Sequence, residues 1–376
     1  MNTPGVCILS TVHLCFDVRM FQAEARTLAR AGFDLTLIAL EDPTPSPTEG
    51  IRILAQPWPR HRLQRMLRTL RVLHLARAQQ VGLYAFHDPE LLPVALLLKL
   101  FTRRRLVYDV HEDVPASIRN KPWLPRLLRP LIARLYLLLE GLALPFIDGL
   151  TLADHAYQKY YRGRRTLTVL NYPLMTYADL YQERPPGGRA TLVYAGSITA
   201  LRGLYEMIEL VRRLRPAYPD ILLRLVGSVG SAAERARADE LIARHNLGGH
   251  VDFTGLVSHL EVHRQILDAD VGLALLHPDP NYVNSLPTKM FEYMMMGRPV
   301  VVSNFPMWTQ IVAQAGCGYA LDPLDLDAVE QALRRLLGDA DLRQEMGRRG
   351  RAAVLEKYNW EKEGERLVEF YQALLG

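Results

Sequence analysis

Short apolar runs alternate with longer amphipathic segments along most of this chain, and this alternation restricts its fold more than any other feature. Such alternation is typical of a parallel sheet covered by helices on both faces. In the first half we expect a helix at 20–31 and strands at 6–10, 35–40, 51–56, 83–86, 106–109, 149–153 and 166–170. In the second half we expect a helix at 204–214 and strands at 192–195, 221–226, 251–254, 271–275 and 300–303. The sequence therefore predicts an α/β fold.

The segment 171–189 interrupts this alternation, because it is rich in proline and glycine and is typical of a linker. A chain of 376 residues is also too long for one core and fits two domains of about 150–200 residues. We therefore expect Rossmann-like domains at 1–172 and 190–358, a linker at 173–189, and a cleft between two parallel sheets. A last helix, at about 361–375 within the segment 359–376, is expected to cross back to the first domain.

The sequence lacks the motifs of several functional classes. No GxGxxG follows the first strand, and there is no GxxxxGK[ST], no HExxH and no Cys/His cluster, so we expect no redox dinucleotide, P-loop or zinc site. Cys7, Cys15 and Cys317 are far apart, there is no signal-like start, and no run of 18 apolar residues appears. These features predict a cytoplasmic protein. The net charge of +5 suits anionic partners such as phosphates and lipids, and nucleic acid is not expected.

The stretch from Asn284 to Val301 carries the clearest chemistry. It reads NSLPTKMFEYMMMGRPVV and places Lys289 and Glu292 one turn apart at the start of a short helix before a strand. A carboxylate and an ammonium at the N-terminus of such a helix can hold a polyol and a phosphate. The stretch therefore indicates a nucleotide-sugar site. The alternative is an exposed Lys289–Glu292 ion pair, worth about 0.3–0.5 kcal/mol.

Several ordered segments resemble the group-one, family-four retaining glycosyltransferases, which have the GT-B fold. In the second half these are YAGSITALRG from Tyr194, LVGSVG from Leu225, VDFTGLV from Val251, and PTKMFEYM with GRPV from Pro287. In the first half, DVRMFQAEAR from Asp17 and YDVHE from Tyr108 resemble that family's N-domain. The resemblance spans nearly the whole chain and implies transfer of a sugar from a nucleoside-diphosphate sugar, with retention at the anomeric carbon.

The resemblance also implies roles for individual residues. Its donor nucleotide site corresponds here to Gly196, Ser197, Arg202, Gly227, Gly255, Leu256, Thr288, Lys289 and Glu292. The donor sugar would meet His111, Asn284, Ser285 and Leu286, and the catalytic residues would be His111, Arg202 and Lys289. The two cations would neutralise the leaving diphosphate, so we expect no metal and no cofactor besides the UDP-sugar or GDP-sugar donor.

Two positions depart from the family pattern. The family usually has two glutamates eight residues apart in the donor motif, and Asn284 stands where the first would be. The family also often has arginine directly after the glycine of the opening loop, where this chain has Ser197. Asn284 can hydrogen-bond to sugar hydroxyls but supplies no negative charge. Two other interpretations stay open: a GT-B nucleotide-sugar epimerase, and a non-catalytic partner protein that has kept the fold, which is the one that these departures favour.

Simpler roles remain for several residues. Arg202 could be a solvated loop cation, and His111 could cap the following helix together with Glu112 and Asp113. In the first half, His13, Asp17 and His87 are candidates for contact with the acceptor. For these the alternatives are an Asp17–Arg19 pair that stabilises the loop and a helix start at Asp88.

Two basic stretches in the first half suggest a further partner. The stretch 126–144 is rich in leucine and arginine, and 60–77 adds a second set of arginines. A basic apolar helix can rest on an anionic membrane, whereas the alternative is a helix packed on the sheet. The sequence thus predicts a transferase that acts on a glycan or lipid-linked acceptor, in cell-surface polysaccharide or glycoconjugate biosynthesis. It would be cytoplasmic and peripheral to the inner face of the plasma membrane.

Overall fold

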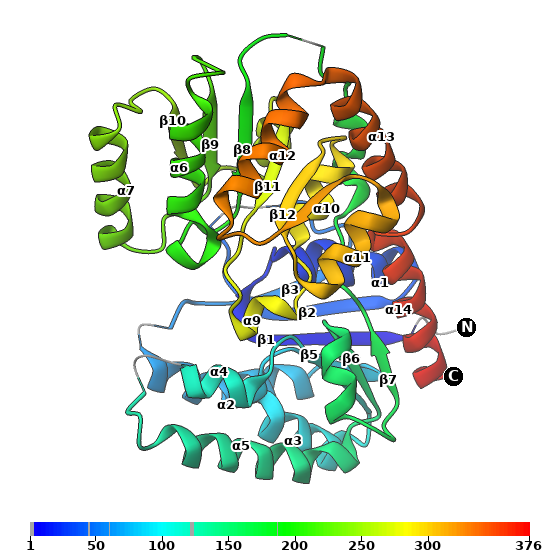
Figure 1. The fold of residues 1–376 in the computed structure, drawn as a ribbon. Coiled ribbons are helices and arrows are strands. Elements are labelled where there is room, and N and C mark those ends of the chain that lie inside the picture. The colour runs from blue at the N-terminus through cyan, green and yellow to red at the C-terminus, as the bar shows by residue number, and fades with distance from the viewer. Residues whose placement is uncertain (1–3, 44–45, 60, 121–123, 186) are drawn as a thin grey trace. The chain divides into compact units, whose positions relative to one another are not determined.

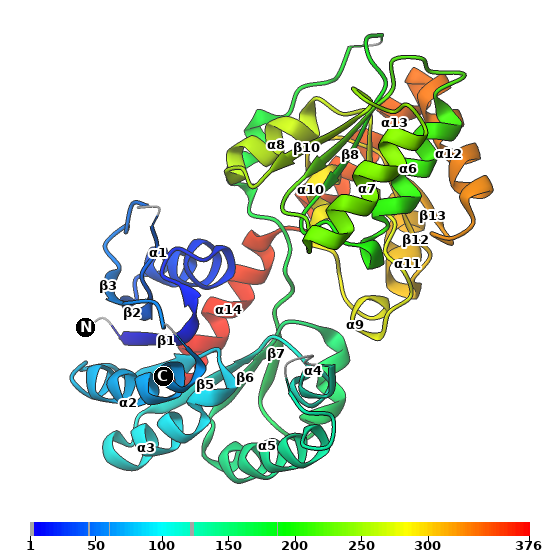
Figure 2. The ribbon, with the colours of Figure 1, turned by 90° about the vertical axis from the view of Figure 1, so that its left-hand side faces the viewer.

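A computed structural model describes residues 4–43, 46–59, 61–120, 124–185 and 187–376. Arg60 of the second basic stretch and Pro186 of the expected linker lie outside these ranges. The chain divides into two compact units (Figures 1 and 2). The first unit contains Met1–Asn171 and Glu361–Gly376, and the second contains Tyr172–Trp360. The expected linker segment is therefore part of the second unit, and the last helix is part of the first.

The first unit is built on a seven-stranded parallel sheet with the strand order β3-β2-β1-β4-β5-β6-β7. The strands are β1 (Gly5–Leu14), β2 (Asp34–Leu40), β3 (Arg52–Gln56), β4 (Leu83–Phe86), β5 (Arg105–Val110), β6 (Gly149–Leu152) and β7 (Thr166–Thr168). The order reverses between β1 and β4, which pair in parallel from Val6 with Leu83 to Leu9 with Phe86. In open α/β sheets ligands bind beyond the carboxyl ends of the strands at such a reversal.

Helices cover both faces of this sheet. Figure 2 shows α2 (Arg62–Arg77), α3 (Leu92–Thr102) and α5 (Arg129–Ala143) on one face, and α1 (Arg26–Arg30) and α14 (Trp360–Leu375) on the other. The helix expected at 20–31 consists of a π-helical segment, η1 (Val18–Ala25), followed by α1. The remaining elements are η2 (Pro89–Leu91), α4 (Val114–Asn120), η3 (Leu144–Phe146) and η4 (His155–Tyr160). No helix in the described ranges is both long and apolar enough to cross a bilayer.

The second unit has a six-stranded parallel sheet with the order β10-β9-β8-β11-β12-β13. Its strands are β8 (Thr191–Ala195), β9 (Leu222–Val226), β10 (Val251–Gly255), β11 (Val271–Ala274), β12 (Val300–Ser303) and β13 (Gly318–Leu321). The strand order of this sheet also reverses, between β8 and β11. We call such a reversal the switch point of a sheet. The edge strand β13 was not predicted, because its half-buried residues form no continuous apolar run.

The helices of the second unit lie on both sides of its sheet (Figure 2). They are η5 (Met175–Leu180), η6 (Ala200–Arg202), α6 (Leu204–Leu214), α7 (Ala232–Arg244), α8 (His259–Leu267), α9 (Pro280–Val283), α10 (Thr288–Met295), α11 (Pro306–Ala315), α12 (Leu326–Gly338) and α13 (Ala340–Glu356). The predicted α/β fold with two parallel sheets is confirmed. Cys7, Cys15 and Cys317 are free and buried.

Candidate functional site

Helix α10 is held against the sheet by its buried face. Met290, Phe291 and Tyr293 are fully buried, and a Cβ on Gly272 of β11 would lie 2.3 Å from the Tyr293 ring. The Tyr293 hydroxyl accepts a hydrogen bond from the Ala195 N–H at the end of β8 (2.8 Å) and donates one to the Leu273 carbonyl (3.2 Å). This anchor fixes α10 on the two strands that flank the switch point.

Two glycines bring neighbouring strand ends close together. Gly196 follows β8 with φ +123°, and Gly227 follows β9 with φ +137°, a conformation that residues with a side chain rarely adopt. A Cβ on Gly227 would lie 2.1 Å from the Gly196 carbonyl oxygen. Gly227 must therefore be glycine for the loops after β8 and β9 to lie as they do.

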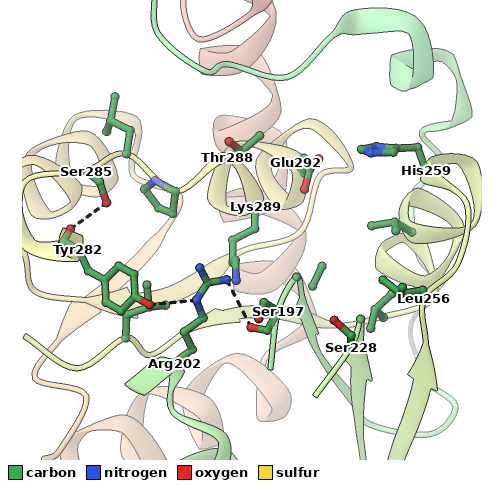
Figure 3. A pocket seen from close by; sticks show the side chains of 18 of the residues that line it. Ser197, Arg202, Ser228, Leu256, His259, Tyr282, Ser285, Thr288, Lys289 and Glu292 are labelled. Atoms are coloured by element: carbon green, nitrogen blue, oxygen red, sulfur yellow. Dashed lines mark hydrogen bonds between the residues drawn. The ribbon is translucent and has the colours of Figure 1, made fainter. Parts of the chain in front are cut away.

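A cavity of about 530 Å³ opens between these loops and α10 (Figure 3). This volume is within the range of small-molecule sites. The predicted residues that line it are Gly196, Ser197, Arg202, Gly227, Ser285, Leu286, Leu256, Thr288, Lys289 and Glu292. Two other predicted site residues of this unit, Asn284 and Gly255, do not belong to the described cavity wall. Asn284 is exposed beside the cavity, and the Gly255 carbonyl accepts a hydrogen bond from the Gly227 N–H (3.0 Å).

Two cations lie together in the middle of the cavity (Figure 3). The Lys289 ammonium lies 3.7 Å from the centre of the Tyr194 ring, and it has no hydrogen-bond partner among the described residues. The Arg202 guanidinium donates to the Tyr282 hydroxyl and to the Ser197 carbonyl, each at 3.4 Å. Burial lowers the pKa of Lys289 well below its usual value, and the Arg202 charge lowers it further. An anion placed here would gain a buried, unpaired cation as its partner.

Glu292 lies farther along the same wall, one turn of α10 after Lys289, on the side of the cavity near His259 (Figure 3). Burial raises the pKa of Glu292, while the charges of His259 and Lys289 act in the opposite direction. In the described part of the chain Glu292 forms no ion pair with Lys289, so the alternative of an exposed surface pair is wrong. Its carboxylate is free to accept hydrogen bonds from a ligand hydroxyl.

The structure adds three residues that the sequence did not single out. His259 begins α8, whose N-cap is Ser258. Tyr282 of α9 packs under Arg202, whose guanidinium lies 5.5 Å from the ring centre. The Trp308 indole of α11 donates to the Ser285 carbonyl (2.6 Å) and holds that loop against the cavity. Ser258 before an apolar helical pattern was a readable signal for the position of His259, but neither Tyr282 nor Trp308 belongs to a motif.

The first unit gathers its candidate residues at its own switch point. The His111 Nε2 lies 2.7 Å from Asp109 Oδ2 and 2.8 Å from His87 Nδ1, and the His13 ring meets the His87 ring edge-on and the His111 ring at a tilt. The Arg19 guanidinium lies 3.0 Å from Glu24 and 3.4 Å from Asp109. His13 at the end of β1, His87 after β4 and His111 after β5 are thus brought together beside buried carboxylates.

This network settles several local alternatives. Asp17 accepts from the backbone N–H groups of Arg19 (3.0 Å) and Met20 (2.9 Å), so it caps η1 instead of pairing with the Arg19 side chain. His13 Nδ1 lies 3.3 Å from the Asp17 carboxylate. The cap of the helix after His111 is Asp113, which accepts from the Ala116 N–H (2.9 Å). His111 is therefore not part of that cap.

Asp88 stands at the N-cap position of η2, as the expected helix start predicts, but its side chain does not supply the cap. Its carboxylate accepts from the Ser10 hydroxyl (2.8 Å) and the Thr11 N–H (2.6 Å), and no cap bond to η2 forms. Asp88 therefore ties the end of β1 to the end of β4.

The buried acids of this network have opposite pKa shifts. Burial by itself would raise the pKa of Asp109, but Arg19 and the hydrogen bonds from His111 and His87 hold it well below its usual range. Burial and the neighbouring Asp109 raise the pKa of Glu24 well above its usual value. Burial also lowers the pKa of His111. The network therefore holds one firmly ionised carboxylate and one that favours its proton.

His87, Asp109 and His111 also have ligand types and spacing suited to a metal, since their ligand atoms lie within 4.8 Å of one another. No sequence motif indicates this group, because His87 follows β4 whereas Asp109 and His111 lie at the end of β5. The Arg19 guanidinium, 3.4 Å from Asp109, already supplies a positive charge to the carboxylate and opposes a second cation there.

Two parallel α/β sheets and a cavity lined by cations at a switch point define a GT-B protein. Two family models match: "Glycosyl transferases group 1" over residues 179–353 and "Glycosyl transferase 4-like domain" over residues 18–169. Together they cover most of the chain, which belongs to the group 1 glycosyltransferases of the family-four type.

Individual relatives agree with this family. A glycogen synthase of Mycobacterium tuberculosis is 26% identical over 193 residues, which is 50% of this chain and 44% of that protein. The chain thus spans about half the length of the curated relatives it matches. Among solved structures, sucrose-phosphate synthase of Thermosynechococcus elongatus has a TM-score of 0.73 at 20% identity, covering 99% of both chains. The Anabaena protein HepE, solved in complex with UDP, has a TM-score of 0.72 at 14% identity, covering 99% of this chain and 100% of that one.

Proposed function

We propose that this protein is a retaining glycosyltransferase that uses a nucleoside-diphosphate sugar and needs no metal. The observation that carries the proposal is the unpartnered Lys289 ammonium beside Arg202 in a cavity that Glu292 also lines. Family membership supports it, and so does the UDP bound by the similar protein HepE. The acceptor would be a glycan or a lipid-linked glycan, in the synthesis of a cell-surface polysaccharide or glycoconjugate.

The cavity suggests an order for the parts of the donor. Lys289 and Arg202 would hold the diphosphate in the middle, where preorganised cations stabilise the charge that develops on the leaving oxygen. Glu292 would accept hydrogen bonds from the ribose hydroxyls, and a hydrogen bond to a charged group contributes about 1.5–3 kcal/mol. The wall near Leu256 and His259 would face the base. Ser285 and Leu286 lie on the opposite side, where the sugar would lie.

In the reaction the bond between the anomeric carbon and the phosphate oxygen breaks, and a bond from the acceptor oxygen to that carbon forms. On a front-face route the departing phosphate accepts the proton of the acceptor hydroxyl, so no separate protein base is required. Because side-chain cations neutralise the leaving group, no divalent ion is required either. The histidine network of the first unit is our candidate for acceptor contact through His13, Asp17 and His87. The contact expected between His111 and the donor sugar stays a prediction.

Calorimetric titration with UDP and GDP tests the donor site. We expect one nucleotide to bind, and Glu292→Ala to weaken it by about tenfold or more. Glu240→Ala, at an exposed position of α7, is the matched control and should bind as the parent protein does. Equal binding by Glu292→Ala, or binding of neither nucleotide, would reject this donor site and favour the non-catalytic alternative.

A second experiment separates transfer from epimerisation. Nucleoside-diphosphate sugars of the nucleotide that binds are incubated with the protein alone, with candidate acceptors, and with acceptors plus a chelator. A new glycoside with the donor's anomeric configuration, formed equally with chelator, supports the proposal. Conversion of the donor sugar without an acceptor would identify an epimerase instead.

A further inference from the structure

The outward side of α5 is covered by leucines. Leu131, Leu135, Leu138 and Leu142 recur at spacings of four, three and four residues, which places them on one stripe of a helix. Their exposed fractions are 54%, 54%, 62% and 60%, and Leu127, just before the helix, is 93% exposed. Single exposed leucines are ordinary, but a continuous stripe of them marks an interaction surface.

The same helix is well packed on its inward side. Ala133, Glu140 and Ala143 are buried, and the Glu140 carboxylate accepts hydrogen bonds from the hydroxyls of Tyr136 (2.7 Å) and Tyr161 (2.8 Å). Because α5 already buries its other side, the leucine stripe is not needed for packing within the first unit. Helix α5 packs inward, as one alternative for the first basic stretch predicts, and membrane contact of its outward apolar face stays a prediction.

The neighbouring helices extend this surface. Figure 2 shows α2, α3 and α5 in one layer on the same face of the first sheet. Met66, Leu67 and Leu70 of α2 are each about 60% exposed, and Leu100 of α3 is 72% exposed. We call the exposed apolar side chains of this layer, with Leu127, the outer helical face.

Charge on this layer has one sign. Glu140, which is buried, is the only acidic residue in the sequences of α2, α3 and α5. Exposed arginines lie on the same helices and on the turns beside them, among them Arg71, Arg77, Arg103, Arg104, Arg126 and Arg134. The nearby acid Asp148 is already paired with Lys99 (2.6 Å) and Arg105 (2.8 Å). Exposed apolar side chains and exposed cations on one layer complement a negatively charged interface that also accepts apolar groups.

We propose that the outer helical face docks on an anionic lipid bilayer, with α5 lying in the plane of the headgroups and its leucines in the acyl boundary. The arginines would contact lipid phosphates, and each basic side chain near such a surface adds to the attraction. This deepens the proposed function, since it names the partner that would present a lipid-linked acceptor. The donor cavity belongs to the second unit and is not part of the docking surface.

Vesicle flotation of the full chain tests the proposal. We expect the protein to float with vesicles that contain about 30% phosphatidylglycerol, to bind pure phosphatidylcholine much less, and to be released by high salt. Leu135→Ser with Leu138→Ser should weaken binding by about tenfold or more, because two exposed leucines no longer enter the bilayer. Leu324→Ser with Leu355→Ser removes two leucines of the second unit with exposed fractions of 54% and 46%, and should change nothing.

Charge is tested separately with Arg126→Glu and Arg134→Glu. This variant should lose binding to anionic vesicles and keep an unchanged melting temperature, since both side chains are exposed. Equal flotation of the leucine, arginine and control variants, or no flotation of the parent protein, would overturn the proposal.

Sedimentation velocity tests whether the outer helical face binds a second copy of the chain instead of a membrane. If the parent protein dimerises without lipid, the leucine variant is monomeric, and neither floats, the face is a subunit interface and the lipid proposal fails. Nucleotide titration of the same variants separates this result from the donor site. Unchanged nucleotide binding together with failed flotation rejects only the membrane proposal.

Discussion

The two units place polar residues at the same topological position and use them in opposite ways. At the switch point of the first sheet, Arg19, Asp109, His87 and His111 are partners of one another. At the switch point of the second sheet, the Lys289 ammonium lines an open cavity without such a partner. The comparison teaches that the fold supplies the location, whereas the pairing of charges decides whether that location is a closed network or a binding site.

The largest effect should come from breaking the closed network. Asp109→Asn removes the carboxylate that faces Arg19 and two histidines, and breaking a buried ion pair from one side costs about 3–5 kcal/mol of unfolding free energy. Because the pKa of Asp109 is lowered in the folded state, this stability is present above its unfolded pKa and is lost as pH falls through the folded value. Denaturant unfolding at neutral pH measures the loss.

Glu24→Gln is the control for that change. Its raised pKa means that the folded state favours the protonated carboxyl, which glutamine resembles, so the cost should be below about 1 kcal/mol. A cost as large as that of Asp109→Asn would show that both acids are ionised in the folded protein.

The second effect concerns the open site. Lys289→Met should weaken nucleotide binding about 30- to 100-fold, because one charged contact to the diphosphate is lost. The same change should raise the melting temperature, since it removes a buried, unpartnered cation. Lys357→Met is a matched control, because Lys357 is exposed and also lies near a tyrosine ring, 5.0 Å from the centre of Tyr358. Binding lost without any gain in stability would mean that Lys289 has a partner in the free protein.

A smaller effect should follow from the backbone at Gly227. Gly227→Ala places a Cβ against the Gly196 carbonyl and forces alanine to φ +137°, which should cost about 1–2 kcal/mol in stability and also weaken nucleotide binding. Gly248→Ala, where a Cβ meets nothing within 4 Å, should be nearly neutral. Thermal unfolding and calorimetry of both variants would show whether the close approach of the two loops matters.

The smallest effect is a pH dependence of nucleotide binding. The protonated form of Lys289 binds the anion, so affinity should fall as pH rises past the lowered pKa of the free protein, by at most about tenfold per pH unit. Titrations from acidic to alkaline pH should show this slope above the lowered pKa in the parent protein and not in Lys289→Met. The same slope in both would assign the titration to another group.

Local pattern predicted much of the second unit. The bounds 204–214 and 300–303 coincide with α6 and β12, because the α6 pattern is amphipathic and β12 is a continuous valine run. Motif residues that are close in sequence, such as Lys289 and Glu292, line one cavity.

Other features depend on the folded chain and have no local signal. Tyr282 and Trp308 reach the cavity only because the fold brings α9 and α11 to its wall, and Glu24 meets His87 only through packing of η1 on the sheet. The π-helical form of η1 was also unpredictable, since its sequence has an ordinary amphipathic pattern. Asn284 is exposed in the turn after α9 and outside the cavity wall, so its expected contact with the donor sugar stays a prediction.

Helix α14 has a consequence for how the protein is made. Leu367, Tyr371 and Leu374 are buried, a Cβ on Gly149 would lie 2.7 Å from Phe370, and Glu363 accepts from the Leu170 N–H (3.0 Å). The first unit is thus completed by a helix that is synthesised after the second unit, which is encoded wholly between its two parts. During synthesis the second unit can fold first, and the earlier-made sheet waits with the part of its apolar face that α14 covers still exposed, a state in which nascent chains depend on chaperones.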